Sequence, residues 1–230
     1  MNGSTATIQI LASLNSLAAG LFLLSAFAIV ATRQVKGCLG LFIGQSLLLA
    51  ASAFLLGILH SSWHLYGVAL VNVLSKAVLI PLILRRTMHR EVYTRREIDQ
   101  VLNIPASLLI ALVLTILSYF LAGHLQGVVV PDLNVPNVAV GIAGLLLGAF
   151  TLTVRREAVP LLIGLLAMEN SVFFTGIAMA PDLPLLVELA AATDGLIIAF
   201  IMGVLTRATH KRIGTTEVGF LANLKEEVRP

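Results

Sequence analysis

The sequence predicts an all-α, polytopic integral membrane protein. Of its 230 residues, 58% are hydrophobic and only 12% are charged, whereas soluble domains carry about 25% charged residues. The mean hydropathy of the chain is +0.97. Its apolar residues gather into seven runs of about 20 residues, the length of helix that crosses the ~30 Å hydrocarbon core of a bilayer. We therefore expect seven transmembrane helices.

The expected helices follow one another along almost the whole chain. The first apolar run is longer than the core of a signal peptide, so we expect it to remain as a helix. The start of the fifth helix is ambiguous because Pro131 and Pro136 both lie close to it. The expected spans are 8–31, 38–59, 63–84, 103–122, 136–154, 159–180 and 183–206, followed by a tail from 207 to 230.

The basic residues predict the orientation of the chain. Fourteen of the 15 Lys and Arg residues follow the first, third, fifth or seventh span, and none follows the second, fourth or sixth. Because cytoplasmic loops carry the excess of Lys and Arg, we expect the N-terminus outside and the C-terminal tail in the cytoplasm. The basic residues are spread between apolar runs and form no single patch, so we expect a lipid bilayer as surroundings and no nucleic-acid partner.

No cofactor is expected in this chain. It has one cysteine, Cys38, and therefore no Cys-x-x-Cys pair of the kind that binds iron–sulfur clusters or metals. It also lacks a phosphate-binding glycine loop and a nucleophile elbow. We expect no metal site, no catalytic residue and no soluble catalytic domain.

Four Asp, Glu, Lys or Arg residues fall inside the expected spans, and three of them lie well away from the span ends. Glu169 and Asp194 lie near the middle of the sixth and seventh spans, and Lys76 lies in the third, one helical turn after Asn72. A charged side chain at the bilayer centre costs at least ~2.5 kcal/mol, and such residues often mark a proton or ion path. The alternative is a set of neutral packing residues held by hydrogen bonds.

We expect Glu169, Asp194 and Lys76 to form the titratable part of a proton path. An apolar setting disfavours the charged form of an acid or an amine, which suits groups that bind and release protons. The polar accessory candidates are Gln45, Asn72, Asn170 and Glu188, the last of them near the outer end of the seventh span.

The chain also shows signs of an internal repeat. A shift of 124 residues aligns 39–50 with 163–174 and pairs Gln45 with Glu169, and a slightly different shift places Lys76 opposite Asp194. This pattern predicts a parallel 3+1+3 arrangement, although apolar helices also align by chance. The units are a first three-helix repeat (1–84), a spacer helix (103–122) and a second three-helix unit (136–206) within a single membrane domain.

Four segments together carry a family resemblance. They are VLSKAVLIPLIL from Val73, RREAVPLLIGLLAMENSVFF from Arg155, LPLLVELAAATDGLIIAFIMGVLTR from Leu183, and GTTEVGFLANLK from Gly214. They resemble the hydrogenase-4 component E family, membrane subunits of formate-hydrogenlyase-type group 4 nickel–iron hydrogenases. The last three helices are also similar to the K subunit of respiratory complex I. In those relatives, two carboxylates on consecutive helices lie on a polar axis through the membrane, and the resemblance places Glu169 and Asp194 at these positions.

The resemblance implies a non-catalytic membrane-arm subunit of a hydrogenase-type oxidoreductase complex in a bacterial or archaeal cytoplasmic (inner) membrane. Such a subunit contributes to proton translocation coupled to redox chemistry in its partners, and it has no activity alone. The implied partners are antiporter-like and other membrane subunits, with soluble subunits that hold the nickel–iron and iron–sulfur centres. Two alternatives remain: a component of a cation/proton antiporter, and a structural membrane anchor without a transport role.

Overall fold

The computed structural model describes residues 2–87, 101–128, 135–179 and 185–213. The loop with Arg90, Arg95 and Arg96 and the tail after residue 213 lie outside the described residues. All elements within the described ranges are helices, which confirms the all-α class for this part of the chain. They are α1 (Asn2–Ala31), α2 (Val35–His60), α3 (Trp63–Asn72), the π-helix η1 (Val73–Leu79), α4 (Ile80–Thr87), α6 (Ile104–Val128), α7 (Val135–Val154), α8 (Ala158–Met179) and α9 (Leu185–Ile213).

Six helical segments in the described part are long and apolar enough to cross a membrane. The elements α3, η1 and α4 count as one of them, because they form the continuous span Trp63–Arg86. The seventh expected span corresponds to α9, in which the described apolar stretch is the shorter Ala192–Leu205. A seventh membrane crossing therefore stays a prediction, as does the division into two repeats.

Two helices continue beyond the ends expected from hydropathy. The helix α6 ends at Val128 and α9 at Ile213, whereas the apolar runs end near 122 and 206. Hydropathy marks the part of a helix that matches the hydrocarbon, and backbone hydrogen bonds continue into more polar residues beyond it. The other expected ends agree with the structure to within a few residues, except that α1 already begins at Asn2.

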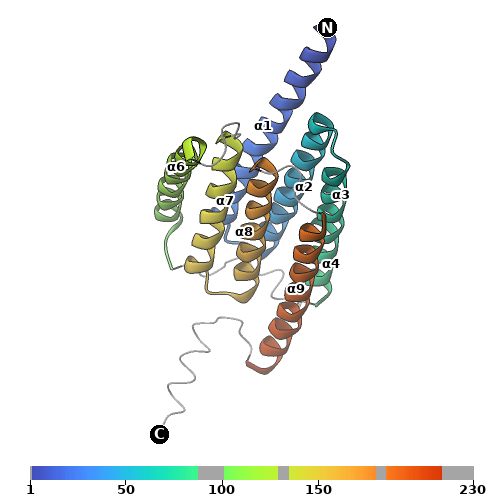
Figure 1. Cartoon of the computed structure of the whole chain (residues 1–230). Helices are drawn as coiled ribbons and strands as arrows, with labels where there is room; N and C mark the ends of the chain where they lie inside the picture. The colour runs from blue at the N-terminus through green and yellow to red at the C-terminus, as the bar shows by residue number, and fades with distance from the viewer. Residues whose placement is uncertain (1, 88–100, 129–134, 180–184, 214–230) are drawn as a thin grey trace.

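The helices pack in two layers, with α7, α8 and α9 in front of α1, α2 and the helix formed by α3, η1 and α4 (Figure 1). Across the layers, α1 packs on α7, α2 on α8, and both α3 and α4 on α9. The helix α6 lies beside α7 at the edge of the bundle and also contacts α1. At one end α1, α4 and α7 finish and α2 and α8 begin; we call it the basic end because Arg33, Lys36, Arg85 and Arg155 lie there.

Glycines let α7 approach α8 closely. A Cβ atom added at Gly148 would lie 2.9 Å from the backbone of Met168, and one added at Gly144 would meet the hydroxyl of Ser171. Such spacing of small residues permits close helix packing in membranes, where helices gain little from the hydrophobic effect. Gly144 and Gly148 therefore allow the close contact with α7 that positions α8, the helix that carries Glu169.

A polar layer divides the apolar core of the bundle. One apolar cluster fills the half next to the basic end and includes Phe42, Ile80 and Leu166. A second cluster fills the other half and includes Leu49 and Phe174. The residues between these clusters on α2, α3–η1 and α8 include most of the polar groups buried in this part of the bundle. We define the polar layer as Gln45, Ser46, Asn72, Ser75, Lys76, Glu169 and Asn170.

Candidate functional site

Lys76 lies on a π-helical turn. The segment η1 interrupts the third span, and the backbone N–H of Ile80 bonds the carbonyl of Ser75, five residues earlier. Pro81 has no N–H group and cannot continue regular α-helical bonding at this point. Both Asn72 and Lys76 are 0% exposed, so this helix presents two polar side chains to the core. Short π turns of this kind are rare and are found frequently at functional sites.

Lys76 pairs with Glu169 inside the bundle. The ammonium Nζ lies 2.9 Å from Oε1 of the carboxylate, and the two side chains are 0% and 24% exposed. The same Nζ lies 4.5 Å from the centre of the Phe173 ring, which adds an attraction between the cation and the aromatic face. The distance between Nζ and Oε1 is within the range over which protons transfer between side chains. The structure thus brings two of the three predicted titratable residues into direct contact.

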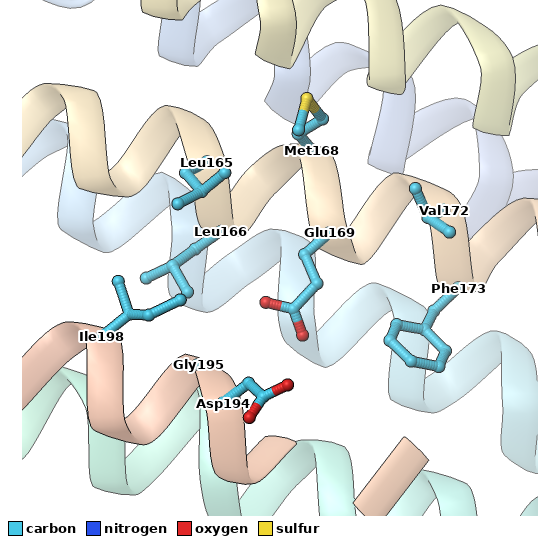
Figure 2. Close-up of a pocket in the computed structure, with 9 residues that line it drawn as sticks. All are labelled: Leu165, Leu166, Met168, Glu169, Val172, Phe173, Asp194, Gly195 and Ile198. Atoms are coloured by element: carbon cyan, nitrogen blue, oxygen red, sulfur yellow. The ribbon is translucent and has the colours of Figure 1, made fainter. Parts of the chain in front are cut away.

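Glu169 and Asp194 both line a cavity between α8 and α9 (Figure 2). Its volume is about 420 Å³, and the other lining residues are apolar or small: Leu165, Leu166, Met168, Val172, Phe173, Gly195 and Ile198. The second oxygen of Glu169 lies only 3.4 Å from the position that a Cβ at Gly195 would occupy, directly beside Asp194 in the chain. Asp194 itself is exposed at the side of the bundle. The cavity therefore joins the buried pair to the outer surface of α9.

On the opposite side of Glu169, buried amides continue the polar layer. Asn170 is 0% exposed and donates from Nδ2 to the hydroxyl of Ser46 over 2.9 Å. These two positions are 124 residues apart, the shift that aligns α2 with α8 in the expected repeat. Gln45 is also 0% exposed, and neither of its amide atoms has a hydrogen-bond partner among the described residues. Buried amides of this kind bind ordered water when there is room for it.

A second buried cation, Arg155, lies at the basic end. Its side chain is 4% exposed. One terminal nitrogen, Nη2, donates to the carbonyls of Ile29, Val30 and Thr32 at distances of 2.8, 3.0 and 2.6 Å. These carbonyls end α1, where the last turn of a helix lacks intrahelical donors. Burial lowers the pKa of the Arg155 guanidinium below its usual value, yet a guanidinium stays charged at physiological pH.

The remaining predicted residues are only partly placed by the structure. Glu188 belongs to α9, but its side chain lies outside the described part of the chain. The role of each titratable residue in proton movement stays a prediction. The sequence analysis missed Ser46 as a partner of Asn170 and Arg155 as a helix cap, because a serine in an apolar run and an arginine after a span are both common. Within the described residues, no group of three or more His, Cys, Asp or Glu side chains could hold a metal ion.

Known proteins resemble this chain over nearly its full length. An uncharacterized protein of Mycobacterium tuberculosis is 28% identical over 209 residues, which cover 91% of this chain and 94% of that protein. Hydrogenase-4 component E of Escherichia coli strain K12 is 28% identical over 214 residues, which cover 90% of this chain and 95% of that protein. The protein of the same name from Shigella flexneri shows the same identity and coverage. The predicted resemblance to hydrogenase-4 component E is thus confirmed.

No family model matches the chain, and no solved structure matches it significantly.

Proposed function

We propose that this chain is a membrane subunit of a hydrogenase-type complex and carries part of a proton path through its polar layer. The observation that carries the proposal is the Lys76–Glu169 pair, a buried amine and a partly exposed carboxylate 2.9 Å apart. The similarity to hydrogenase-4 component E over 90% of the chain supports membership of such a complex. The six described helices that are long and apolar enough to cross a membrane support its place in the bilayer.

In the proposed path, Glu169 exchanges protons with both of its neighbours. On one side, the proton shared with Lys76 moves over a single hydrogen-bond distance. On the other side, the cavity of about 420 Å³ leads toward Asp194. A water molecule takes up about 30 Å³ in the liquid, so a cavity of this volume has room for water that relays protons between the two acids. Gln45 and Asn170 extend the polar layer toward α2 without titrating themselves.

The redox chemistry belongs to other subunits in this proposal. Soluble subunits with nickel–iron and iron–sulfur centres carry out the oxidoreduction, and antiporter-like and other membrane subunits adjoin this chain. This chain alone has no oxidoreductase activity. It lies in the bacterial or archaeal cytoplasmic (inner) membrane with the N-terminus outside, because the basic residues at the ends of α1, α4 and α7 favour the cytoplasmic side.

The proposal is tested with variants whose side chains keep their size but cannot carry a proton. Glu169→Gln and Asp194→Asn keep side-chain size and hydrogen bonding but cannot carry a proton. In the purified complex reconstituted into vesicles, each variant is expected to retain dye-linked electron transfer and to lose coupled proton uptake. Glu188→Gln, also on α9, is the control and is expected to affect coupling less. Unchanged coupling in the Glu169→Gln, Asp194→Asn double variant would support the structural-anchor alternative instead.

A further inference from the structure

The cavity between α8 and α9 opens on the side of the bundle. At its rim, Val172 is 51% exposed and Ile198 is 37% exposed, and the Asp194 carboxylate beside them is exposed too. All three residues lie in the middle portions of their helices, away from the helix ends. The cavity therefore faces outward at the depth of the bilayer interior. Figure 2 shows both carboxylates pointing into this space.

The charges of the cavity are unbalanced. Glu169 and Asp194 are the two ionisable residues that line it. Lys76 neutralises Glu169 at 2.9 Å, and its 0% exposure puts it out of reach of any group that enters from outside. When both acids are ionised, the open side of the cavity therefore carries the negative charge of Asp194. A matching cation is needed from outside the described chain.

Lipid does not supply that cation in the bilayer interior. Acyl chains offer no hydrogen-bond donor, and a charged Asp at the centre of a membrane helix is costly unless it is paired. The outer face of α6 presents the contrasting case. Its exposed residues there, such as Leu112 at 51% and Ile116 at 62%, are purely apolar and suit contact with lipid. The face with the α8–α9 cavity thus requires a neighbour that carries a cation, whereas the outer face of α6 suits contact with lipid.

We propose that the α8–α9 cavity is the docking site for a transmembrane helix of a partner subunit, which brings a lysine or arginine side chain to Asp194. The cavity volume of about 420 Å³ accommodates the end of such a side chain. This inference rests on the proposed membership of a complex, and it assigns the face through which the complex meets the proton path.

The test is site-specific photo-crosslinking in the assembled complex in native membranes. A benzophenone amino acid replaces Val172 or Ile198 at the rim, and in matched controls it replaces Leu112 or Ile116 on α6. We expect the rim positions to crosslink to an apolar segment of another membrane subunit, within one helical turn of a Lys or Arg that mass spectrometry identifies. The α6 positions are expected not to give this product. Adducts with lipid only, with a second copy of this chain, or with a segment without a basic residue would overturn the proposal.

A charge change tests the cation directly. Asp194→Lys places like charges together, which costs several kcal/mol at an interface, so the crosslink yield at Val172 is expected to fall at least about tenfold. Asp194→Asn keeps hydrogen bonding and is expected to reduce the yield less. An undiminished yield in Asp194→Lys would overturn the proposal. If this variant fails to assemble, the crosslinked segment found with Asp194 in place still decides the question.

The crosslinking readout does not depend on proton movement. Loss of coupling in Glu169→Gln together with lipid adducts at the rim would leave the proposed function standing and the docking site wrong. A specific crosslink together with unchanged coupling would support the docking site and show that the proposed proton path is wrong.

Discussion

Two buried cations in this bundle are held in different ways. Arg155 is 4% exposed and donates to three backbone carbonyls at the end of α1. Lys76 is 0% exposed and lies 2.9 Å from a carboxylate that is itself 24% exposed. The three carbonyls that Arg155 contacts belong to the backbone and carry no ionisable proton, and Cys38 and Glu157 also act on it electrostatically. The partner of Lys76 is a carboxylate, and this carboxylate lines a cavity.

The two cations also differ in their own chemistry. A guanidinium cannot lose its proton at physiological pH and presents several donors in a rigid plane, so it suits a permanent cap. An ammonium is a compact charge on a flexible stem, and here it meets the carboxylate of Glu169. Burial of a charge alone therefore does not identify a functional residue in this chain.

The largest effect on stability is expected at Arg155. Arg155→Met removes the Nη2 donor from three carbonyls at the end of α1, and we expect the free energy of unfolding to fall by about 3 kcal/mol. Arg156→Met, at the exposed neighbouring residue, is the control and should change it by less than about 0.5 kcal/mol. Unfolding in mixed micelles measures both. Equal stability of the two variants would mean that Arg155 is not a cap.

A smaller loss is expected at Lys76. Lys76→Met leaves the Glu169 carboxylate without its cation, and the partial exposure of Glu169 limits the expected loss to about 2 kcal/mol. The double variant Lys76→Met, Glu169→Gln should lose at least about 1 kcal/mol less than the sum of the two single variants.

Lys76→Arg sharpens the same comparison. It keeps the positive charge near Glu169 but holds its proton, so it should retain more stability than Lys76→Met and still lose coupled proton uptake. Strictly additive losses of stability in the double variant Lys76→Met, Glu169→Gln would mean that Lys76 is a structural cation like Arg155. Full coupled proton uptake in Lys76→Arg would mean the same.

The smallest effect is expected at Gln45. Its amide atoms have no hydrogen-bond partner among the described residues, so Gln45→Leu should leave the free energy of unfolding unchanged or raise it by less than about 1 kcal/mol. On the same helix, Ser52 donates to Asn15 over 2.6 Å, so the control Ser52→Ala should cost about 1 kcal/mol. If Gln45→Leu lowers the free energy of unfolding more than Ser52→Ala does, the Gln45 side chain is stabilised by polar contacts, as the two cations are.

Much of the fold follows from patterns that are local in the sequence. Runs of about 20 apolar residues locate the helices because the bilayer sets their length. The same rule identifies Lys76, Glu169 and Asp194 as candidate functional residues, since charges inside such runs are costly. The sequence does not reveal that Lys76 meets Glu169, because their contact depends on how α3–η1 packs against α8. The π turn is also hidden, since its apolar residues and Pro81 equally fit a regular helix with a kink.

Arg155 shows the opposite limit of sequence reasoning. The positive-inside rule treats it as one of several basic residues after a span, together with Arg156. The structure separates the two, because Arg155 is buried against α1 and Arg156 is exposed. Only the three-dimensional neighbourhood distinguishes a residue that orients the chain from one that completes a helix. The exposure of Asp194 is likewise visible only in the structure, because it depends on how α9 packs against its neighbours.

The cap of α1 forms late in the synthesis of the chain. Arg155 follows Ile29 by 126 residues, so the carbonyl of Ile29 acquires this donor only after most of the chain has been made. At a synthesis rate of about 5–20 residues per second, the delay is roughly 6–25 seconds. During this interval the end of α1 depends on water or lipid headgroups for its hydrogen bonds. The end of the first helix is therefore completed only when the residue that follows α7 arrives beside it.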